Sequence, residues 1–367
     1  MKIPFKVIGL PVLSLSLLVS GCGDKGSGGG SGGGAEASSK PLVTKDAKLA
    51  IALNLDKDQA FKIVDSYFKT VSDMHVMDED NLKEAKEKIE ACKKDIFACC
   101  DSDPKVLEFV EKSGLRDAKL KWAVVSMEDF KVVEGEPRPE GVSVAIGGKF
   151  DLEKAIAACE GEKDCDVSFE KTEVEGEKAW RIAPKGDRQS KKLKEAGVDP
   201  YVASLGGRLA LVAMSQDTLA KQIRLYKKGA EKGDALGGFT AAKGEFLRLY
   251  LSGIGELVKQ NVPQDELSQL GGFVPNGDKI VTGLQTLTID TKVDSNGMLS
   301  GTIRLKAASE EDADALRTLA KTGLMAATAQ VAKDPATPEE TKKMIKDIKI
   351  GGSDGVVEIQ SGASSSR

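Results

Sequence analysis

The sequence has few of the residues on which most enzymes depend for catalysis. Its 367 residues include a single histidine, His75, and only 5% of them are aromatic. Histidine is the side chain that most often moves protons at neutral pH. A serine hydrolase would have to use His75 as its base, so the composition disfavours that chemistry. The shortage of aromatic residues also disfavours a stacking platform for sugars or nucleic-acid bases.

The sequence also lacks a net positive charge and paired cysteine motifs. The net charge is -4, which argues against nucleic acid as a partner because DNA and RNA are bound through clustered Lys and Arg. The one basic run, residues 185–194 (KGDRQSKKLK), is interpreted as a solvated loop or helix face. The six cysteines contain no Cys-x-x-Cys spacing, which disfavours thioredoxin-like redox chemistry and zinc ribbons.

The N-terminus has the pattern of a secretion signal. Lys2 and Lys6 precede an apolar run over residues 7–18, and small residues follow it. The run is too short for a transmembrane helix, which needs about 20 apolar residues, and Pro11 interrupts it. The segment ends in Val-Ser-Gly-Cys at residues 19–22, which resembles the lipobox of bacterial lipoproteins.

The resemblance to bacterial lipoproteins covers residues 1–22 and implies a lipid anchor. It implies cleavage before Cys22, a diacylglyceryl thioether on the cysteine sulfur and an acyl chain, such as palmitate, on the new amine. More than one buried chain makes such anchoring stable. Gly23 follows the cysteine, where an Asp often signals retention in the inner membrane. We therefore expect a cell-envelope protein on the outer membrane, facing the periplasm or the cell surface.

The rest of the chain divides by composition into a tether and a folded body. Residues 22–41 begin with Cys22 and continue as a Gly/Ser-rich stretch that cannot form a core. A flexible chain of this length spans roughly 25 Å on average. The expected organisation is a signal peptide (1–21), the lipidated cysteine and tether (22–41), two α+β units (42–235 and 236–360) and a disordered tail (361–367).

Disulfide bonds are the default for cysteines in an exported protein. With Cys22 assigned to lipid, five cysteines remain, so at least one is free or pairs between chains. Cys159 and Cys165 flank Gly161, and we predict a disulfide between them. Cys92 and Cys99 lie two turns apart on a predicted helix, too far to bond, so Cys100 is the better partner for Cys92.

Alternating apolar patterns and turn signals predict an α+β fold. Antiparallel hairpins should form one or two sheets, with amphipathic helices packed on one face. Hairpins are expected where Glu175-Gly176, Gly206-Gly207 and Asn296-Gly297 separate apolar runs. Helices are expected at about 80–99, from Pro104 to Gly114, after Asp151, and at about 217–228, 253–260 and 310–332.

The order of these elements also suggests an internal duplication. Strands at 284–293 and 298–307 followed by a helix match the strand, strand and helix of residues 120–159. The strands at 345–350 and 356–360 match the hairpin of residues 167–182. The alternative is that any α+β protein shows such runs.

One weak metal-binding candidate remains, and no cofactor is indicated. Met74, His75 and Met77 lie close together, and thioether and imidazole groups suit copper ions. The other interpretation of this stretch is the frayed end of a helix. No catalytic residue is assigned.

Three hypotheses for function follow from these observations. The first is a non-enzymatic binding or structural protein displayed from the membrane, whose partner is an envelope protein or a small ligand. The second is a carrier of apolar ligands in a cleft between sheet and helices. The third is a hydrolase that uses carboxylates from distant segments.

Overall fold

The computed structural model describes the greater part of the chain after the tether. The described residues are 42–55, 61–62, 65, 79–94, 104–115, 118–133, 136–162, 165–228, 236, 245–273, 277–293, 299–333, 337 and 339–361. Within them the chain is α+β with antiparallel strands, as the sequence predicts.

The chain divides into two compact units. Unit 1 contains residues 1–46, 54–61 and 71–243, and unit 2 contains residues 47–53, 62–70 and 244–367. The division falls after Lys243, and the sequence predicts a boundary after residue 235. The apolar residues 48–55 predict a strand in the first unit; the observed strand, residues 49–54, belongs almost entirely to unit 2.

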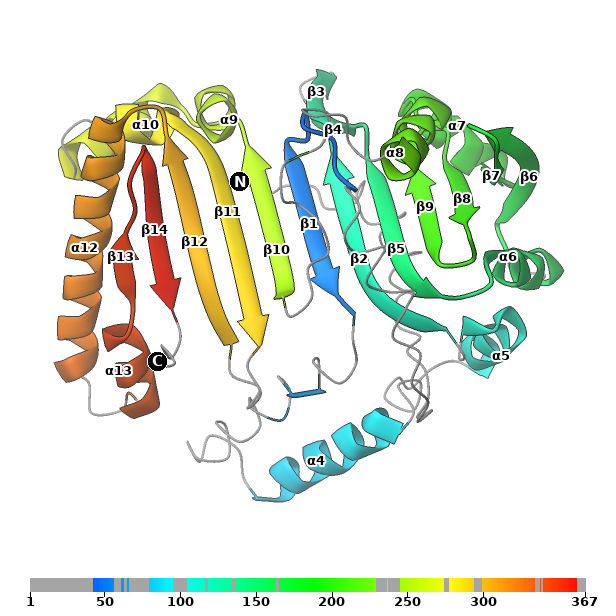
Figure 1. Ribbon diagram of the computed structural model, residues 1–367, viewed down its shortest axis with the longest axis horizontal. Coiled ribbons are helices and arrows are strands. Elements are labelled where there is room, and N and C mark those ends of the chain that lie inside the picture. The colour runs from blue at the N-terminus through cyan, green and yellow to red at the C-terminus, as the bar shows by residue number, and fades with distance from the viewer. Residues whose placement is uncertain are drawn as a thin grey trace. The chain divides into compact units, whose positions relative to one another are not determined.

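Six strands of unit 1 form one antiparallel sheet in the described part of the chain. Their order across the sheet is β2-β5-β9-β8-β7-β6 (Figure 1). The strands are β2 (Lys119–Met127), β5 (Ser143–Lys149), β6 (Val167–Val174), β7 (Glu177–Pro184), β8 (Tyr201–Leu205) and β9 (Leu209–Ala213). The helices are α4 (Glu79–Lys94), α5 (Pro104–Ser113), α6 (Leu152–Gly161), α7 (Asp187–Glu195) and α8 (Gln216–Lys228).

A small second sheet in unit 1 was not predicted. β3 (Asp129–Val133) and β4 (Glu136–Glu140) pair as an antiparallel hairpin. The Pro, Gly and Glu residues of 134–141 predict a loop from sequence, which covers β4 but not β3. The sequence predicts a loop because Pro137 and Pro139 lack the backbone N–H that strand pairing uses, and proline is rare in strands for that reason. The hairpin tolerates them because β3 and β4 pair only with each other, so each keeps an edge that needs no donor.

Helices contact both faces of the unit 1 sheet rather than one. Lys178 of β7 forms an ion pair with Glu153 of α6, with 3.1 Å between Nζ and Oε1. The neighbouring Glu177 forms an ion pair with Lys227 of α8 at 2.6 Å. Successive residues of a strand point to opposite faces. The two helices therefore lie against opposite faces of the sheet.

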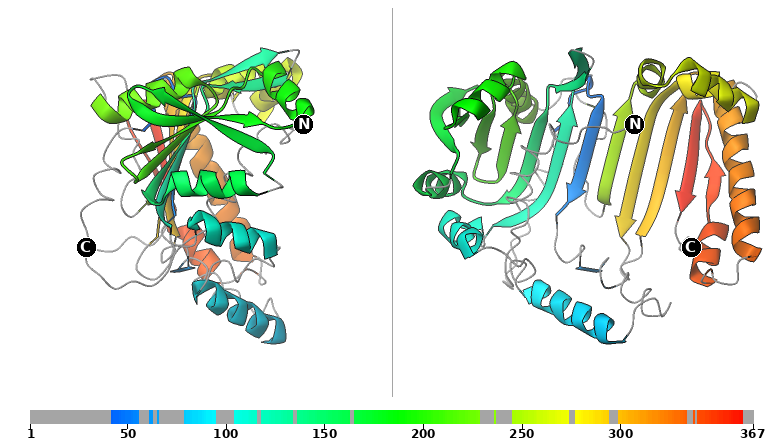
Figure 2. Two further views of the ribbon diagram at one scale, coloured as in Figure 1. Left: turned by 90° about the vertical axis from the view of Figure 1, so that its right-hand side faces the viewer. Right: turned by 180° about the vertical axis from the view of Figure 1, so that it is seen from behind.

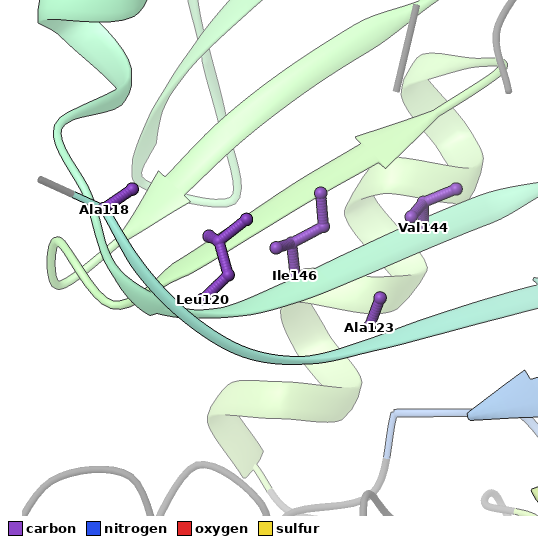
Figure 3. Close-up of a cluster of buried hydrophobic side chains, with 5 residues drawn as sticks. All are labelled: Ala118, Leu120, Ala123, Val144 and Ile146. Atoms are coloured by element: carbon purple, nitrogen blue, oxygen red, sulfur yellow. The ribbon is translucent and has the colours of Figure 1, made fainter. Parts of the chain in front are cut away.

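Buried apolar side chains of the strands and helices form the core of unit 1. One cluster joins β2 to β5 and contains Ala118, Leu120, Ala123, Val144 and Ile146 (Figure 3). The 0% exposed Leu219 and Ile223 of α8 lie four residues apart, which places them on one stripe of that helix. This spacing explains why α8 was predictable from sequence.

Six strands of unit 2 also pair antiparallel among the described residues. Their order is β13-β14-β12-β11-β10-β1 (Figure 1). The strands are β1 (Leu49–Asn54), β10 (Glu245–Ser252), β11 (Leu284–Val293), β12 (Leu299–Ala307), β13 (Lys349–Gly351) and β14 (Val356–Ser361). The helices are α9 (Ile254–Asn261), α10 (Gln264–Phe273), α11 (Gly277–Thr282), α12 (Glu310–Lys333) and α13 (Glu339–Lys346).

The sheet of unit 2 has one apolar face and one charged face. Leu249, Ile289, Ile303 and Ile359 lie opposite one another in register across β10, β11, β12 and β14. The long helix α12 packs on this apolar side, where its buried Ala313 and Leu316 join a cluster with strand residues. Figure 2 shows α12 running alongside β13 and β14.

Strand pairing supports the internal duplication and corrects one part of it. In unit 1, β2 pairs with β5, and β5 pairs with β9, the second strand of the β8–β9 hairpin. In unit 2, β11 pairs with β12, and β12 pairs with β14, the second strand of the β13–β14 pair. The terminal pair of unit 2 therefore corresponds to β8–β9, and not to the β6–β7 hairpin at residues 167–182. In the part of the chain that the structure describes, β6, β7 and α7 are found in unit 1 alone.

Candidate ligand-binding site

A hollow of about 370 Å³ lies in unit 1 between the start of α6 and the strands β7 and β8. Three of its lining groups are apolar, two are acidic, and one is basic. The lining residues are Phe150, Asp151, Leu152, Glu153, Lys178, Trp180, Ser204 and Gly207. A volume in this range suits a small ligand, at the lower end of typical binding sites.

The first turn of α6 forms one wall because its N-terminus is firmly capped. Asp151 is in an extended conformation, and its Oδ1 accepts a hydrogen bond from the backbone N–H of Lys154 at 3.0 Å. An aspartate cap of this kind stabilises a helix by about 1 kcal/mol. The sequence predicted this cap, and it fixes where Leu152 and Glu153 project.

The predicted disulfide fixes the other end of α6. Cys159 lies in the last turn of the helix and is bonded to Cys165, with 5.6 Å between the Cα atoms. The disulfide-bonded sulfur of Cys165 also lies 3.3 Å from the carbonyl oxygen of Val167 at the start of β6. The bridge therefore links α6 to the chain that enters the β6–β7 hairpin, so the wall and the strands behind it are tied together.

The floor of the hollow is an apolar cluster beneath the helix. Trp180 is only 3% exposed and packs with Ile156 of α6 and Val202 of β8. Leu152, also in this cluster, is partly buried and lines the hollow. The indole ring is therefore part of the core on one side and of the hollow on the other.

The rim of the hollow carries more negative than positive charge. Lys178 pairs with Glu153, but their side chains are 76% and 56% exposed. Exposed ion pairs contribute only about 0–1 kcal/mol, so this pair can open at little cost. Asp151 is the remaining charged group of the rim. The hollow therefore suits a ligand that combines a small apolar group with a positively charged one.

A second polar cluster lies on the charged face of the unit 2 sheet. Asp290 of β11 accepts from Arg248 of β10 at 2.7 Å and from Arg304 of β12 at 2.6 Å. Arg304 also donates to Glu358 of β14 at 2.7 Å. Burial tends to lower the pKa of Arg304, but its hydrogen bonds to Glu358 and Asp290 outweigh this and raise it. These charges satisfy one another across four strands, so the cluster is better explained as a brace than as a binding site.

The end of this cluster contains an incompletely bonded carboxylate. Glu245 accepts from Arg248 through Oε1 at 2.6 Å, while its buried Oε2 has no hydrogen-bond partner. Its side chain is 12% exposed.

The predicted site residues have different outcomes in the structure. The Cys159–Cys165 disulfide is confirmed. Cys92 lies in α4, while its proposed partner Cys100 lies outside the described residues. The lipidation candidate Cys22 and the metal candidates Met74, His75 and Met77 also lie outside the described residues. Within the described part of the chain, no three His, Cys, Asp or Glu side chains are grouped to hold a metal ion.

The sequence did not indicate the hollow itself. Lys178 and Trp180 gave no motif, because they reach the start of α6 only through the pairing of β7 in the sheet. The Asp151 cap was the one visible signal, and it predicts a helix rather than a site.

Comparison with known proteins gives no relative for this chain: no family model, curated protein or solved structure matches it. Among the residues that the structure describes, none of the helices combines the length and the apolar character needed to cross a membrane.

Proposed function

We propose that the protein is a non-enzymatic binding protein of the bacterial cell envelope, anchored to the membrane by lipid on Cys22. The lipobox-like signal and the Gly-rich stretch after it support the anchor and the display of the body from the membrane. The observation that carries the binding role is the hollow beside α6, with an apolar floor and an acidic rim.

The proposed ligand is a small cation with an apolar group, such as an aromatic amine or a basic side chain of a peptide. Its apolar part would contact Phe150, Leu152 and the accessible edge of Trp180. Its positive charge would replace Lys178 beside Glu153 or bind at Asp151. A positive charge over an aromatic ring adds about 0.5–2 kcal/mol where the geometry allows it.

A carrier of apolar ligands is the second candidate, because the hollow lies between a helix and a sheet and has an apolar floor. The charged rim favours the cationic ligand over it, since a long acyl chain would have to lie against Asp151 and Glu153. The two candidates differ in the ligand class that should bind. A fatty acid would compete only in the second case.

Trp180 provides a direct measurement of binding. The chain has two tryptophans, and replacing Trp122 by Phe leaves Trp180 as the sole indole reporter. We expect aromatic amines at micromolar to millimolar concentration to change its fluorescence saturably, and fatty acids to have no effect. Ser204→Phe should abolish the response by filling the hollow from β8, and Glu153→Gln should weaken it.

A surface lysine-to-alanine change away from the hollow, Lys221→Ala, is the matched control and should respond like the parent. The binding proposal fails if no cationic ligand alters Trp180 fluorescence, or if Ser204→Phe responds as strongly as the parent. Saturable binding of fatty acids alone would favour the carrier instead.

The anchor has its own test. Wild-type protein should partition with membranes and carry a lipid mass on an N-terminal Cys22, and Cys22→Ala should lose both. A mature N-terminus elsewhere, without lipid, would contradict the anchor while leaving the binding measurement unaffected.

A further inference from the structure

β6 is the edge strand of the unit 1 sheet, and half of its backbone groups face away from the protein. The β6–β7 hairpin has a two-residue turn in which Glu175 and Gly176 have φ of 53° and 74°. In such a hairpin the residues flanking the turn, Val174 and Glu177, form a hydrogen-bonded pair. Counting back along β6 from Val174, every second residue forms backbone hydrogen bonds with β7. The N–H and C=O groups of the residues between them point outward.

The outward-facing residues of β6 are Val167, Phe169, Lys171 and Glu173. The start of this edge is already occupied within unit 1. The backbone N–H of Phe169 donates to Oε1 of Glu160 in α6 at 3.3 Å. This contact agrees with the outward direction deduced from the turn, and it leaves the backbone groups of Lys171 and Glu173 as the open part of the edge.

The side chains along this open part are also exposed and available. Residues 170–173 are all exposed. Among the described residues neither Lys171 nor Glu173 forms an ion pair, since Lys178, which is opposite Glu173 in register, is paired with Glu153. An exposed edge with unpaired backbone groups is a template for another strand.

Symmetry restricts how two copies of β6 can join. In an antiparallel pair, residues directly opposite each other point to the same face of the sheet. Two identical strands related by a two-fold axis must therefore pair about one central residue, through which the axis passes. Each even-numbered residue then lies opposite an even-numbered residue of the second copy, and each odd-numbered residue lies opposite an odd-numbered one. This leaves only a few registers to compare.

Charge selects one of these registers. Centring on Glu170, Lys171 or Glu173 places a charge directly opposite the same charge, which is unfavourable. Centring on Thr172 places Lys171 opposite Glu173 of the second copy, and Glu173 opposite Lys171. Since Lys171 and Glu173 are also the outward-bonding residues, this register forms four backbone hydrogen bonds and two Lys–Glu pairs.

We propose that the protein forms a symmetric homodimer in which the β6 edges of two copies pair antiparallel about Thr172. The unit 1 sheet continues across the two copies. The occupant of the edge is a second copy of this chain because the sequence Lys-Thr-Glu is complementary to itself in this register and in none of its neighbours.

Disulfide trapping in the full-length protein tests this register. At Thr172 the two copies face each other as a non-hydrogen-bonded pair, with Cα atoms about 4.5 Å apart, within reach of a disulfide. Thr172→Cys should therefore give a covalent dimer under a mild oxidant. Glu170→Cys is the matched control, because its two copies would lie about 14 Å apart, at 3.4 Å per residue over four residues. The parent protein gives the background from native cysteines.

Charge exchange in the Thr172→Cys background tests the pairing itself. Lys171→Glu alone and Glu173→Lys alone should each reduce the trapped dimer several-fold, because like charges then meet twice. The double exchange should restore the parent yield. Circular dichroism of each variant establishes that the fold is retained.

The proposal is overturned if Thr172→Cys traps no more dimer than Glu170→Cys, or if the double exchange traps as little as the single ones. Trapping of a different protein at residue 172 in membranes would also overturn it, in favour of a heterologous partner strand.

Discussion

Replacing Gly147 by alanine should destabilise unit 1 because no space exists for a side chain there. Gly147 of β5 lies opposite Trp122 of β2 in the sheet. A Cβ atom at this position would lie 2.0 Å from Cε2 of the Trp122 ring, well inside van der Waals contact. Trp122 is itself only 5% exposed, so the ring cannot swing into solvent. Overpacking of this kind costs about 1–3 kcal/mol.

Thermal unfolding followed by circular dichroism measures this cost. For a unit of this size each 1 kcal/mol lowers Tm by about 2–4 °C, so Gly147→Ala should lower it by roughly 2–12 °C. Trp122→Leu removes the ring and should destabilise by about 3 kcal/mol on its own. In the double variant the new methyl group occupies vacated space, so Gly147→Ala should then cost nearly nothing.

Gly148 is the control for this double-mutant cycle. A Cβ atom there would lie 2.3 Å from the backbone oxygen of Lys119, which no side-chain truncation can move. Trp122→Leu should therefore rescue Gly147→Ala and not Gly148→Ala. Additive costs for Trp122→Leu and Gly147→Ala would refute the reasoning, because independent sites add and contacting ones do not.

Three further predictions concern the disulfide of unit 1 and two carboxylates of unit 2. Replacing Cys159 and Cys165 together by serine should lower the free energy of unfolding by about 2 kcal/mol in the chain-entropy model of a short loop, and an unchanged denaturation midpoint would contradict it. The pKa of Glu310 is lowered by hydrogen bonds from Arg317 and then from a backbone N–H, so its stabilisation exists above the ordinary glutamate pKa of about 4.5 and disappears as the pH falls below it. Glu310→Gln should therefore unfold with less dependence on pH below about 4.5, and an identical acid profile would count against this coupling. Asp290→Ala should destabilise unit 2 by about 3 kcal/mol because two arginines lose their shared acceptor, whereas Asp290→Asn, which keeps one, should cost less in urea unfolding.

Local signals in the sequence predicted the elements that local chemistry determines. The turn at Glu175-Gly176 has positive φ at both residues, as a two-residue hairpin requires. Gly206 and Gly207 also have positive φ, but Leu205 pairs with Leu209, so the predicted two-residue connection is three residues long and includes Arg208. The helix after Asp151 begins where its cap predicts, and Pro104 opens α5. The Cys159–Cys165 bridge followed from spacing alone, since a six-residue separation across a glycine is short enough to close.

Elements that depend on partners distant in the chain were missed. The helices α10, α11 and α13 have weak or mixed apolar patterns, and the buried Ile280 of α11 is explained only by its cluster with α12 and β14. The match of β13–β14 to residues 167–182 was wrong because the order of strands along the chain does not determine which strands pair with each other in the sheet. The hollow was missed for the same reason, since pairing alone brings Trp180 to α6.

The comparison of the two units indicates where the distinctive features of this protein lie. Both units share two paired strands followed by a returning pair, so those strands are explained by the common architecture. The addition in unit 1, β6, β7 and α7, has no counterpart among the described residues of unit 2. It supplies Trp180 and Lys178 of the hollow, and it supplies the open edge at Lys171 and Glu173.

The common architecture does not require this added segment, and yet a disulfide holds the chain where it enters the segment. A binding role is therefore most reasonably sought there. The proposed ligand site and the proposed dimer edge therefore share one hairpin, on which Lys171 lies directly opposite Trp180. A ligand that displaces Lys178 from Glu153 frees it to pair with Glu173, its cross-strand neighbour. Glu173 would then be less available to a second copy, so ligand and dimer should oppose each other.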